Sequence, residues 1–574
     1  MKFSNWEIIG FDRDTAVDFC RDGVNPLVSV LLASRGVTGI EEARKILGEV
    51  PFEFFDPFLL KDMDKAVSCI NSAIENGERI AIYGDYDVDG MTSSALLELW
   101  LRRKGADTER YIPGRFSEGY GLNRAALESL KLRGVSLVIS VDCGITAIEE
   151  ARYAREIGLK LVITDHHECR DELPDAVAVV DPKRHDCSYP NKSLAGVGVA
   201  FKLVCALDPA INLDEMFRRY GDLVAVGTIA DVMPVTGENR ELIKRGLSVL
   251  NKAPRPGIKR LLQEVSTQPG KVNSTTVGFT LAPRLNAAGR MNQTELSVEL
   301  LLTENDEDAD RLAAELCRLN SERRALEQEI YEEASSMLSK SKPDGPIFLA
   351  QRGWYQGVTG IVAAKMAERH RVPAIIISID DDGMGRGSCR SFGAFPLYDA
   401  LAACADLLEN YGGHEMAVGV SVAEKNIGEL NRRITRYYSD RAEGAAVPGL
   451  RLDFEVEKPE LLTVSNLEAM ERLEPFGSGN PPPCLCITGA EVASVLAIGE
   501  EKHTRLKLDK AGKILDCIFF SMSPKDLGVS EGMMVDVAFE PQINDFRGRT
   551  SVQLHVLDVR PCRERVESGN DRRV

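Results

Sequence analysis

Short apolar runs alternate with stretches of helical periodicity from the N-terminus to about Pro234. Runs at 80–83, 137–141 and 161–164 have the length and apolar content of buried β-strands. The stretch 147–156 has the pattern of a helix, so it forms a βαβ unit with the strands on either side. We therefore expect an α/β lobe with parallel strands.

A long helix is predicted after this lobe. Apolar residues recur at three- and four-residue steps, and multiples of these, from about residue 306 to about residue 339: Leu312, Leu316, Leu319, Leu326 and Ile330. At 1.5 Å per residue such a helix would reach roughly 50 Å, which is enough to connect two lobes. We interpret it as a packing and spacer element.

The pattern changes twice more towards the C-terminus. Strand-like runs at 347–350 and 373–377 flank a helical stretch at 360–369, which predicts a second α/β domain. Short strand-like segments at 505–508, 515–519, 535–539 and 552–557 predict a small β-barrel. The tail 563–574 is charged and without periodicity, and we expect it to be disordered.

A chain of 574 residues is too long for a single core, so several domains are expected. We divide it into six parts. They are an N-terminal extension of the catalytic lobe (1–60), the catalytic domain (61–235), a helical region with the long connecting helix (236–342), a second α/β domain (343–445), a barrel (449–560) and a disordered tail (561–574).

Composition favours an ordinary globular protein, with 44% hydrophobic and 28% charged residues. No apolar run approaches the ~20 residues that span a bilayer, and the N-terminus lacks the apolar core of a secretory signal. The 13 cysteines include no C-x-x-C pair. We expect free thiols in a cytoplasmic protein without a membrane partner.

The net charge of −18 argues, taken alone, against a polyanionic partner. It does not exclude one, because local basic grooves and bound metal ions neutralise phosphates. Some of the acids that make the chain negative also belong to a possible metal site, where a bound cation would offset their charge.

Acids and histidines gather at three predicted strand ends. The first run leads into Gly84-Asp85-Tyr86-Asp87-Val88-Asp89-Gly90, the second into Asp142, and the third into Asp165-His166-His167. A single aspartate after a strand would be interpreted as a turn or helix-cap residue. Three such positions in one parallel sheet favour a divalent-metal site, because clustered carboxylates are costly to bury without a cation.

Ten motifs in a characteristic order carry a family resemblance. They are GDYDVDG (84–90), EGYGLN (118–123), VDCGI (141–145), TDHHE (164–168), LAGVGVAFKL (194–203), GTIADVMPV (227–235), PRLNAAGRM (283–291), GVTGIVA (357–363), GGHEMAVG (412–419) and FGSGNPPP (476–483). With these motifs the chain resembles the DHH phosphoesterases, and among them the RecJ family of single-stranded-DNA exonucleases.

The resemblance implies two α/β lobes, called the DHH and DHHA1 domains, joined by a long helix and followed by an OB-fold barrel. It implies a hydrolase that degrades single-stranded DNA from 5′ to 3′ into 5′-mononucleotides, in DNA recombination and repair. The implied partners are single-stranded DNA, a single-stranded-DNA-binding protein and a helicase. We expect a monomer.

The resemblance also assigns metal ligands. One or two Mn²⁺ or Mg²⁺ ions would be held by Asp87, Asp89, Asp142, His166 and Asp231. Mixed carboxylate and imidazole ligands suit Mn²⁺ and tolerate Mg²⁺. Three further catalytic residues, Asp85, Asp165 and His167, would lie in or just behind this ligand shell, with His167 orienting the scissile phosphate or protonating the leaving 3′ oxygen.

Residues that would bind the substrate phosphates follow from the same resemblance, since a guanidinium matches phosphate geometry. They are Arg115, Arg284, Asn286, Arg290, Ser388, Arg390, Gly412, Gly413 and His414, and Arg290 would also take part in catalysis. In the family, the Ser-x-Arg element and the arginine before the EGYGL string form a pocket for the 5′-terminal phosphate.

Four positions depart from the family pattern: Tyr355, Thr359, Cys389 and Val418. Cys389, between Ser388 and Arg390, bears most directly on the shape of the phosphate pocket. In the barrel, basic residues at 502–507 and the residues Phe546, Arg547 and Arg549 are candidates for contact with single strands.

Besides the more distant option of a pyrophosphatase, two alternatives remain open at this point. One is a DHH phosphodiesterase of short oligoribonucleotides or cyclic dinucleotides, which the long helix and the barrel disfavour. The other is an inactive DHH-type scaffold that binds DNA, which the complete set of metal-ligand candidates disfavours.

Overall fold

The computed structural model describes residues 3, 5–116, 118–252, 254–268, 270–338, 345–441, 449–546 and 548–562. The chain forms two compact units. One is Phe54–Ala446, and the other combines Met1–Glu53 with Val447–Val574. The disorder expected for the tail 563–574, and the DNA contacts expected for Arg547 and for the side chain of Phe546, lie outside this description.

The catalytic lobe is built on a parallel five-stranded sheet in the order β3-β2-β4-β5-β6. The strands are β2 (Arg79–Tyr83), β3 (Thr108–Tyr111), β4 (Val135–Val141), β5 (Lys160–Thr164) and β6 (Ala178–Val180). Successive residues of β2 face opposite sides, with Ile80 and Ile82 in one hydrophobic cluster and Ala81 and Tyr83 in another. Both faces of the sheet are therefore buried, which explains the nearly uninterrupted apolar runs in the sequence.

Helices supply the two covering layers of this sheet. One cluster contains residues of α4 (Met63–Glu75), α5 (Val88–Arg103), α8 (Gly196–Leu207) and α9 (Leu213–Ala230). The other contains residues of α6 (Arg124–Leu132) and α7 (Ile148–Glu156). The predicted parallel α/β lobe is confirmed.

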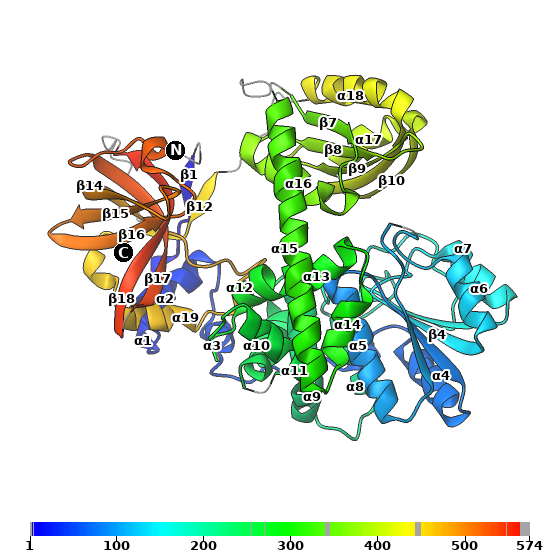
Figure 1. Ribbon diagram of the computed structural model, residues 1–574. Helices are drawn as coiled ribbons and strands as arrows, with labels where there is room; N and C mark the ends of the chain where they lie inside the picture. The colour runs from blue at the N-terminus through cyan, green and yellow to red at the C-terminus, as the bar shows by residue number, and fades with distance from the viewer. Residues whose placement is uncertain are drawn as a thin grey trace. The chain divides into compact units, whose positions relative to one another are not determined.

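A helical region continues the unit through α10 (Gly237–Lys252), α11 (Pro256–Glu264), α12 (Ser274–Thr276), a π-helical turn η2 (Val277–Leu281), α13 (Ala282–Arg290) and α14 (Glu295–Leu302). It ends in α15 (Asp306–Met337), a helix of 32 residues and so about 48 Å. Asn305 caps this helix by accepting hydrogen bonds from the backbone of Glu307 and Asp308. The predicted long helix is confirmed, and it runs from the catalytic lobe to the second lobe (Figure 1).

The second lobe has a mixed five-stranded sheet in the order β10-β11-β9-β8-β7. Its strands are β7 (Ile347–Arg352), β8 (Ala374–Ile379), β9 (Met384–Arg390), β10 (Leu408–His414) and β11 (Ala417–Ala423), and only β7 and β8 are parallel. Helix α16 (Gln356–His370) packs with α15 in one hydrophobic cluster. Helices α17 (Leu397–Ala402) and α18 (Glu424–Ser439) contribute to another.

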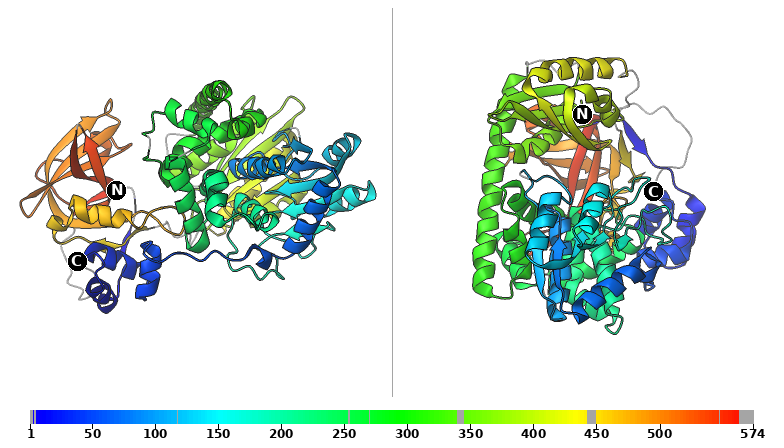
Figure 2. Two further views of the ribbon diagram at one scale, coloured as in Figure 1. Left: turned by 90° about the horizontal axis from the view of Figure 1, so that it is seen from below. Right: turned by 90° about the vertical axis from the view of Figure 1, so that its right-hand side faces the viewer.

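The second unit contains a closed barrel. Strands β14 (Leu485–Ile498), β15 (His503–Lys510), β16 (Lys513–Phe519), β18 (Arg549–Pro561) and β17 (Met534–Phe546) pair in this order, and β17 pairs back to β14. The pairing of β16 with β18 is parallel, whereas the other four pairings within the barrel are antiparallel. Smaller elements complete the unit: β12 (Leu450–Leu452), β13 (Phe454–Glu455), α19 (Val464–Glu471) and α20 (Pro524–Leu527). Figure 2 shows the strands of the barrel in orange to red.

The N-terminal segment differs from our interpretation, which made residues 1–60 an extension of the catalytic lobe. Helices α1 (Arg13–Arg21), α2 (Pro26–Ser34) and α3 (Ile40–Ile46) share one hydrophobic core with the barrel, and β1 (Trp6–Ile8) pairs with β12. Helix α2 is buried on nearly every side, and Arg35 after it forms an ion pair with Asp453 at 3.2 Å. An apolar helix packs wherever a complementary surface exists, and its place in the chain does not identify that surface.

Within the described residues, no helix combines the length and the apolar character needed to cross a bilayer.

Candidate metal centre and nucleotide cavity

Strands β2, β4 and β5 are neighbours in the sheet, so the acidic segments that follow them meet at one edge. The order of strands reverses between β2 and β4, which is where open α/β sheets form their ligand crevices. The backbone N–H of Asp142 donates to the carbonyl of Thr164 at 3.0 Å and ties two of the strand ends together.

The turn after β2 positions three aspartates. Asp87 caps α5, since its Oδ1 accepts hydrogen bonds from the backbone of Asp89 at 3.0 Å and of Gly90 at 3.1 Å. Oxygens of Asp85, Asp87 and Asp142 lie within 4.8 Å of one another. A Cβ atom at Gly90 would lie 2.6 Å from the backbone of Asp85, so this turn requires glycine.

The first turn of α8 holds Asp89 in place. The carboxylate accepts hydrogen bonds from the backbone N–H groups of Gly196 at 2.6 Å and Val197 at 2.8 Å. Helix N-termini favour such anions. A Cβ atom at Gly196 would lie 2.6 Å from Oδ1 of Asp142, so the glycine lets the helix approach the metal-site candidates closely.

His166 lies at the centre of the carboxylates. Its Nε2 is 3.1 Å from Oδ1 of Asp142, 3.5 Å from Oδ2 of Asp231 and 3.8 Å from Oδ2 of Asp89. The side chain of His166 is only 4% exposed, and its Nε2 has no hydrogen-bond partner among the described residues. Oδ1 of Asp142 and Oδ2 of Asp231 likewise have no hydrogen-bond partner among the described residues.

The electrostatics of this group call for a cation. Burial lowers the pKa of His166 to about 3, with a smaller contribution from His167, so the imidazole is neutral. Burial and the neighbouring carboxylates raise the pKa of Asp89 to about 7 and that of Asp231 to about 8. Buried, unpaired carboxylates around a neutral imidazole are the donor set of a divalent metal site, and the residues present fit one.

Asp165 and His167 form a second layer. Asp165 accepts hydrogen bonds from Nδ1 of His167 at 2.7 Å and from the backbone of His166 at 2.7 Å and Ile145 at 2.9 Å. Burial opposes the ionisation of Asp165, but the hydrogen bond and charge of His167 lower its pKa below the ordinary value. Burial also opposes the charge on His167, yet Asp165 raises the pKa of this histidine to about 9. Asp165 therefore orients a protonated His167.

Two residues of this centre have an unfavourable backbone conformation. Asp142 has φ of 61° and Val232, next to Asp231, has φ of 57°. Non-glycine residues in this region are uncommon, above all when β-branched, and they cluster at functional sites.

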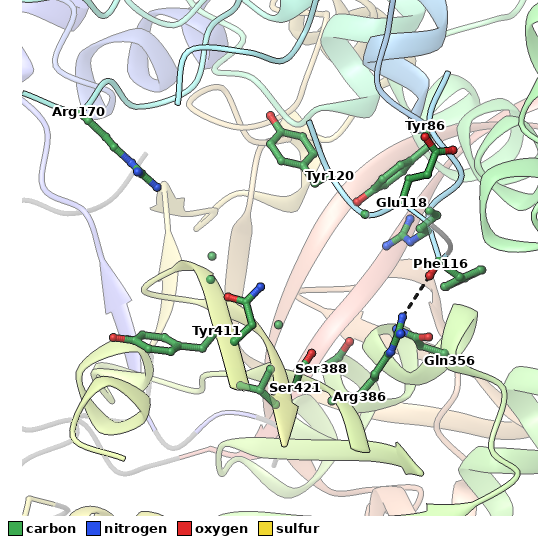
Figure 3. A pocket seen from close by; sticks show the side chains of 18 residues that line it. Tyr86, Phe116, Glu118, Tyr120, Arg170, Gln356, Arg386, Ser388, Tyr411 and Ser421 are labelled. Carbon is green, nitrogen blue, oxygen red and sulfur yellow. Dashed lines mark hydrogen bonds between the residues drawn. The ribbon is translucent and has the colours of Figure 1, made fainter. Parts of the chain in front are cut away.

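A cavity of about 880 Å³ adjoins the carboxylate group, between the catalytic lobe and the second lobe. Figure 3 shows its walls, with Tyr86, Glu118 and Tyr120 from the first lobe and Arg386, Ser388 and Tyr411 from the second. The hydroxyl of Tyr120 lies 3.1 Å from Nδ1 of His167, so the cavity reaches the metal-site candidates.

Guanidinium groups line or adjoin this cavity. Arg115 lies over the ring of Tyr86, at 4.8 Å from its centroid. Burial and the charges of Arg115, Arg323 and Arg390 lower the pKa of Arg290 to about 9, and burial also lowers the pKa of Arg390. Crowded positive charges of this kind favour the binding of an anion.

The structure places the remaining predicted residues in two groups. Ser388, Gly412 and Gly413 line the cavity. Arg284, Asn286 and His414 are not among its described lining residues. The guanidinium of Arg284 donates to the carbonyl of Thr280 at 2.7 Å.

The departures from the family pattern can be placed too. The side chain of Cys389 is fully buried in the core of the second lobe, on the face of β9 opposite Ser388, so it does not narrow the cavity. Val418 packs in the same core. Tyr355 donates its hydroxyl hydrogen to the carbonyl of Arg290 at 2.9 Å, and Thr359 lies 3.4 Å from the Ser388 hydroxyl.

Our interpretation of the sequence missed most of the residues that line the cavity, among them Tyr120, Arg170, Arg386 and Tyr411. Arg386 donates to the carbonyl of Phe116 at 3.1 Å and so connects the two lobes. Tyr120 stands in the EGYGLN motif, and Arg386 and Tyr411 lie close to predicted phosphate-binding residues. Their place in the sequence does not show that they share a cavity with Arg170, because only the folded chain brings these side chains together.

On the barrel, several predicted basic residues are paired. Lys502 binds Glu500 at 3.0 Å, and Arg505 binds Asp516 at 2.7 Å. Phe520 is 49% exposed and forms edge contacts with His503 and His555, at ring-centroid distances of 5.5 and 5.1 Å.

Comparisons with known proteins agree with this architecture. Family models described as "DHH family, N-terminal domain", "DHHA1 domain" and "RecJ OB domain" match residues 79–228, 344–440 and 452–558. Among solved structures, RecJ from Thermus thermophilus in complex with Mn²⁺ has a TM-score of 0.84 at 29% identity, covering 99% of this chain and 81% of that one. A manganese-bound exonuclease RecJ has a TM-score of 0.58 at 35% identity, covering 66% of this chain and 95% of that one.

Curated relatives extend over nearly the whole chain. The single-stranded-DNA-specific exonuclease RecJ of Bacillus subtilis (strain 168) is 40% identical, covering 96% of this chain and 70% of the relative. RecJ of Escherichia coli (strain K12) is 34% identical, covering 93% and 96%. Because identity at this level runs through both α/β lobes and the barrel alike, the chain belongs to the RecJ family.

Proposed function

We propose that this protein is a metal-dependent exonuclease that hydrolyses single-stranded DNA from the 5′ end to 5′-mononucleotides, in DNA recombination and repair. One observation supports this most directly. The carboxylates around His166, of which Asp142 and Asp231 have oxygens without hydrogen-bond partners among the described residues, adjoin, through Tyr120, a cavity bordered by arginines. Relatives named as single-stranded-DNA-specific exonucleases support the choice of substrate.

We infer that Asp87, Asp89, Asp142, His166 and Asp231 hold one or two Mn²⁺ or Mg²⁺ ions. Thermus thermophilus RecJ structures contain each of these ions. When bound, such ions supply an activated water and neutralise the charge that develops on the scissile phosphate.

The chain's own groups have separate tasks in this proposal. Asp165 orients His167, whose proton is held where the scissile phosphate or the leaving 3′ oxygen would lie. Asp85, whose pKa is raised well above its ordinary value by burial and by Asp87, lies in or just behind the ligand shell. Arg115, Ser388 and Arg390 bind the 5′-terminal phosphate, Gly412 and Gly413 let the backbone approach the strand, and Arg290 adds positive charge beside them.

Further roles stay predictions: phosphate contacts by Arg284, Asn286 and His414, cooperation with a single-stranded-DNA-binding protein and a helicase, a monomeric state and a cytoplasmic location. The limits of the other five parts of the chain stay predictions as well.

The decisive experiment is a time course with Mn²⁺ on single-stranded DNA labelled at the 5′ or the 3′ end, with blunt duplex as control. We expect immediate release of a labelled mononucleotide from the 5′ end, gradual shortening of the 3′-labelled strand, and an intact duplex. Cleavage restricted to di- to tetranucleotides would instead identify a short-oligonucleotide phosphodiesterase. Tight binding without cleavage would identify a scaffold.

A further inference from the structure

Strand β10 presents consecutive residues to the cavity, although neighbours in a regular strand face opposite sides. Asn410, Tyr411, Gly412 and Gly413 all line it. The pairing of β10 with β11 shifts register between Leu408 and Asn410, which marks a bulge. Bulges re-aim side chains and are frequent beside active sites, and this one lies just before the cavity-lining segment that begins at Asn410.

The ring of Tyr411 is supported from outside the cavity. It contacts the ring of Tyr398, on α17, at a centroid distance of 5.8 Å and an interplanar angle of 52°. Tyr411 is half-buried, on an edge strand of the second lobe. A supported aromatic ring that also lines a cavity can stack against a flat ligand.

Arg170 belongs to the catalytic lobe and lines the same cavity. In Figure 3, Arg170 and Tyr411 reach towards one side of the cavity from the two lobes, whereas Tyr86, Glu118 and Phe116 lie at the other. Arg170 is exposed, and no ion pair within the described residues engages it. Its guanidinium is therefore available to a ligand.

The position of a terminal nucleotide follows from the proposed function, on which this inference rests. Arg115 and Ser388, which would bind the 5′ phosphate, line the cavity, and Tyr120 connects it to the carboxylate group where the next phosphate is cleaved. The first nucleotide then occupies the cavity, and its base extends towards the wall formed by Arg170, Asn410 and Tyr411.

We propose that Tyr411 and Arg170 form a subsite for the base of the 5′-terminal nucleotide. The base stacks on Tyr411, and the planar guanidinium of Arg170 covers its other face or edge. Stacking on one aromatic side chain changes affinity by about five- to 150-fold and accepts any base. The subsite therefore holds the terminal nucleotide firmly without reading its sequence.

The test combines enzyme variants with a substrate that lacks only the first base. Tyr411→Ala, Tyr411→Phe and Arg170→Ala are compared with wild type on 5′-phosphorylated single-stranded DNA and on the same strand with an abasic first nucleotide. With Mn²⁺ present, Tyr411→Ala should lower kcat/KM about tenfold on the intact strand and leave kcat/KM on the abasic strand unchanged. Tyr411→Phe should retain activity, and Arg170→Ala should show a smaller loss that is also confined to the intact strand.

Arg432→Ala, an exposed arginine on α18 that pairs with Glu429, is the matched control and should match wild type on both strands. Equal losses of kcat/KM for Tyr411→Ala on both strands would overturn the subsite, because the Tyr411 ring would then stabilise the enzyme and not bind the base. An unchanged kcat/KM on the intact strand would overturn it as well. If wild type fails to cleave the intact strand, it is the proposed exonuclease function that fails, and the two failures are thereby distinguished.

Discussion

Burial of the residues around His166 favours the binding of a metal ion. Oxygens of three aspartates lie within 4 Å of Nε2 of the neutral His166 imidazole. Among the described residues, this nitrogen and the facing oxygens of Asp142 and Asp231 have no hydrogen-bond partners. Removing such groups from water costs several kcal/mol per charge unless a counter-charge is present. A bound cation provides that counter-charge, so metal binding and local stability are coupled in this centre.

Replacing Asp142 or His166, two of the proposed metal ligands, should remove activity without unfolding the protein. We expect Asp142→Ala and His166→Ala to abolish DNA cleavage and to weaken Mn²⁺ binding in calorimetry, while the circular dichroism spectrum stays that of wild type. Asp175→Ala, an exposed aspartate paired with Arg155, serves as control and should remain active. Full activity in either ligand variant would refute the metal-site assignment.

The phosphate pocket makes a separate prediction at this scale. Arg390→Ala should reduce the preference for a 5′-phosphorylated over a 5′-hydroxyl end, because a charge-assisted contact contributes about 1.5–3 kcal/mol. The measurement is the ratio of kcat/KM for the two ends. The same ratio in wild type and variant would place the 5′-phosphate pocket elsewhere.

Elements rather than single residues set the distances in the centre. Helices α5 and α8 begin at the carboxylates, with Asp87 as the cap of one and Asp89 bound to the first turn of the other. Glycines at 90 and 196 make the close approach possible, since a Cβ at either would lie 2.6 Å from an atom of Asp85 or Asp142. The glycine-rich AGVG string is thus a packing requirement of the metal centre.

Gly196→Ala should therefore impair both stability and catalysis. Overpacking of this kind costs about 1–3 kcal/mol and would displace the carboxylate of Asp142. Thermal unfolding and kcat, measured together, test this. Gly428→Ala is the matched control, because a Cβ there meets nothing within 4 Å and alanine in a helix is favoured by about 1 kcal/mol. Wild-type kcat in Gly196→Ala would contradict the packing argument.

At the scale of the whole molecule, the chain divides into two compact units with separate hydrophobic cores. The metal-site candidates and the cavity belong to the unit Phe54–Ala446, whereas α1 to α3 share a core with the barrel. Ligands of the first unit should thus leave the stability of the second unit unchanged.

Thermal unfolding should reveal this division as two transitions. Mn²⁺ should raise one transition temperature, because a ligand stabilises only the unit that binds it. Leu31→Ala, which truncates a fully buried residue of α2, should lower the other transition temperature, because such a truncation reduces the free energy of unfolding by about 2–5 kcal/mol. A single transition that responds to both changes would show that the units unfold together.

Several features could be predicted from the sequence because they depend on local pattern. The parallel sheet follows from its apolar runs, the helix beginning at Asp306 from its periodicity, and the gathering of Asp85, Asp142 and His166 from their places after strands. The family motifs extended the predicted site to Asp231 and to the arginines. The sheet, the helix and the positions of these side chains could be predicted because they depend on residues that are near in sequence or on a periodic pattern.

Tertiary structure decided what depends on contacts between distant segments. Nothing in residues 1–53 indicates that their helices pack with a barrel more than 400 residues away, because apolar surface is not specific for one partner. Arg170 and Tyr411 line one cavity only because the folded chain, with α15 between the lobes, brings the two lobes together. The pKa values of His166 and Asp231 also arise from burial, and burial is a property of the folded chain.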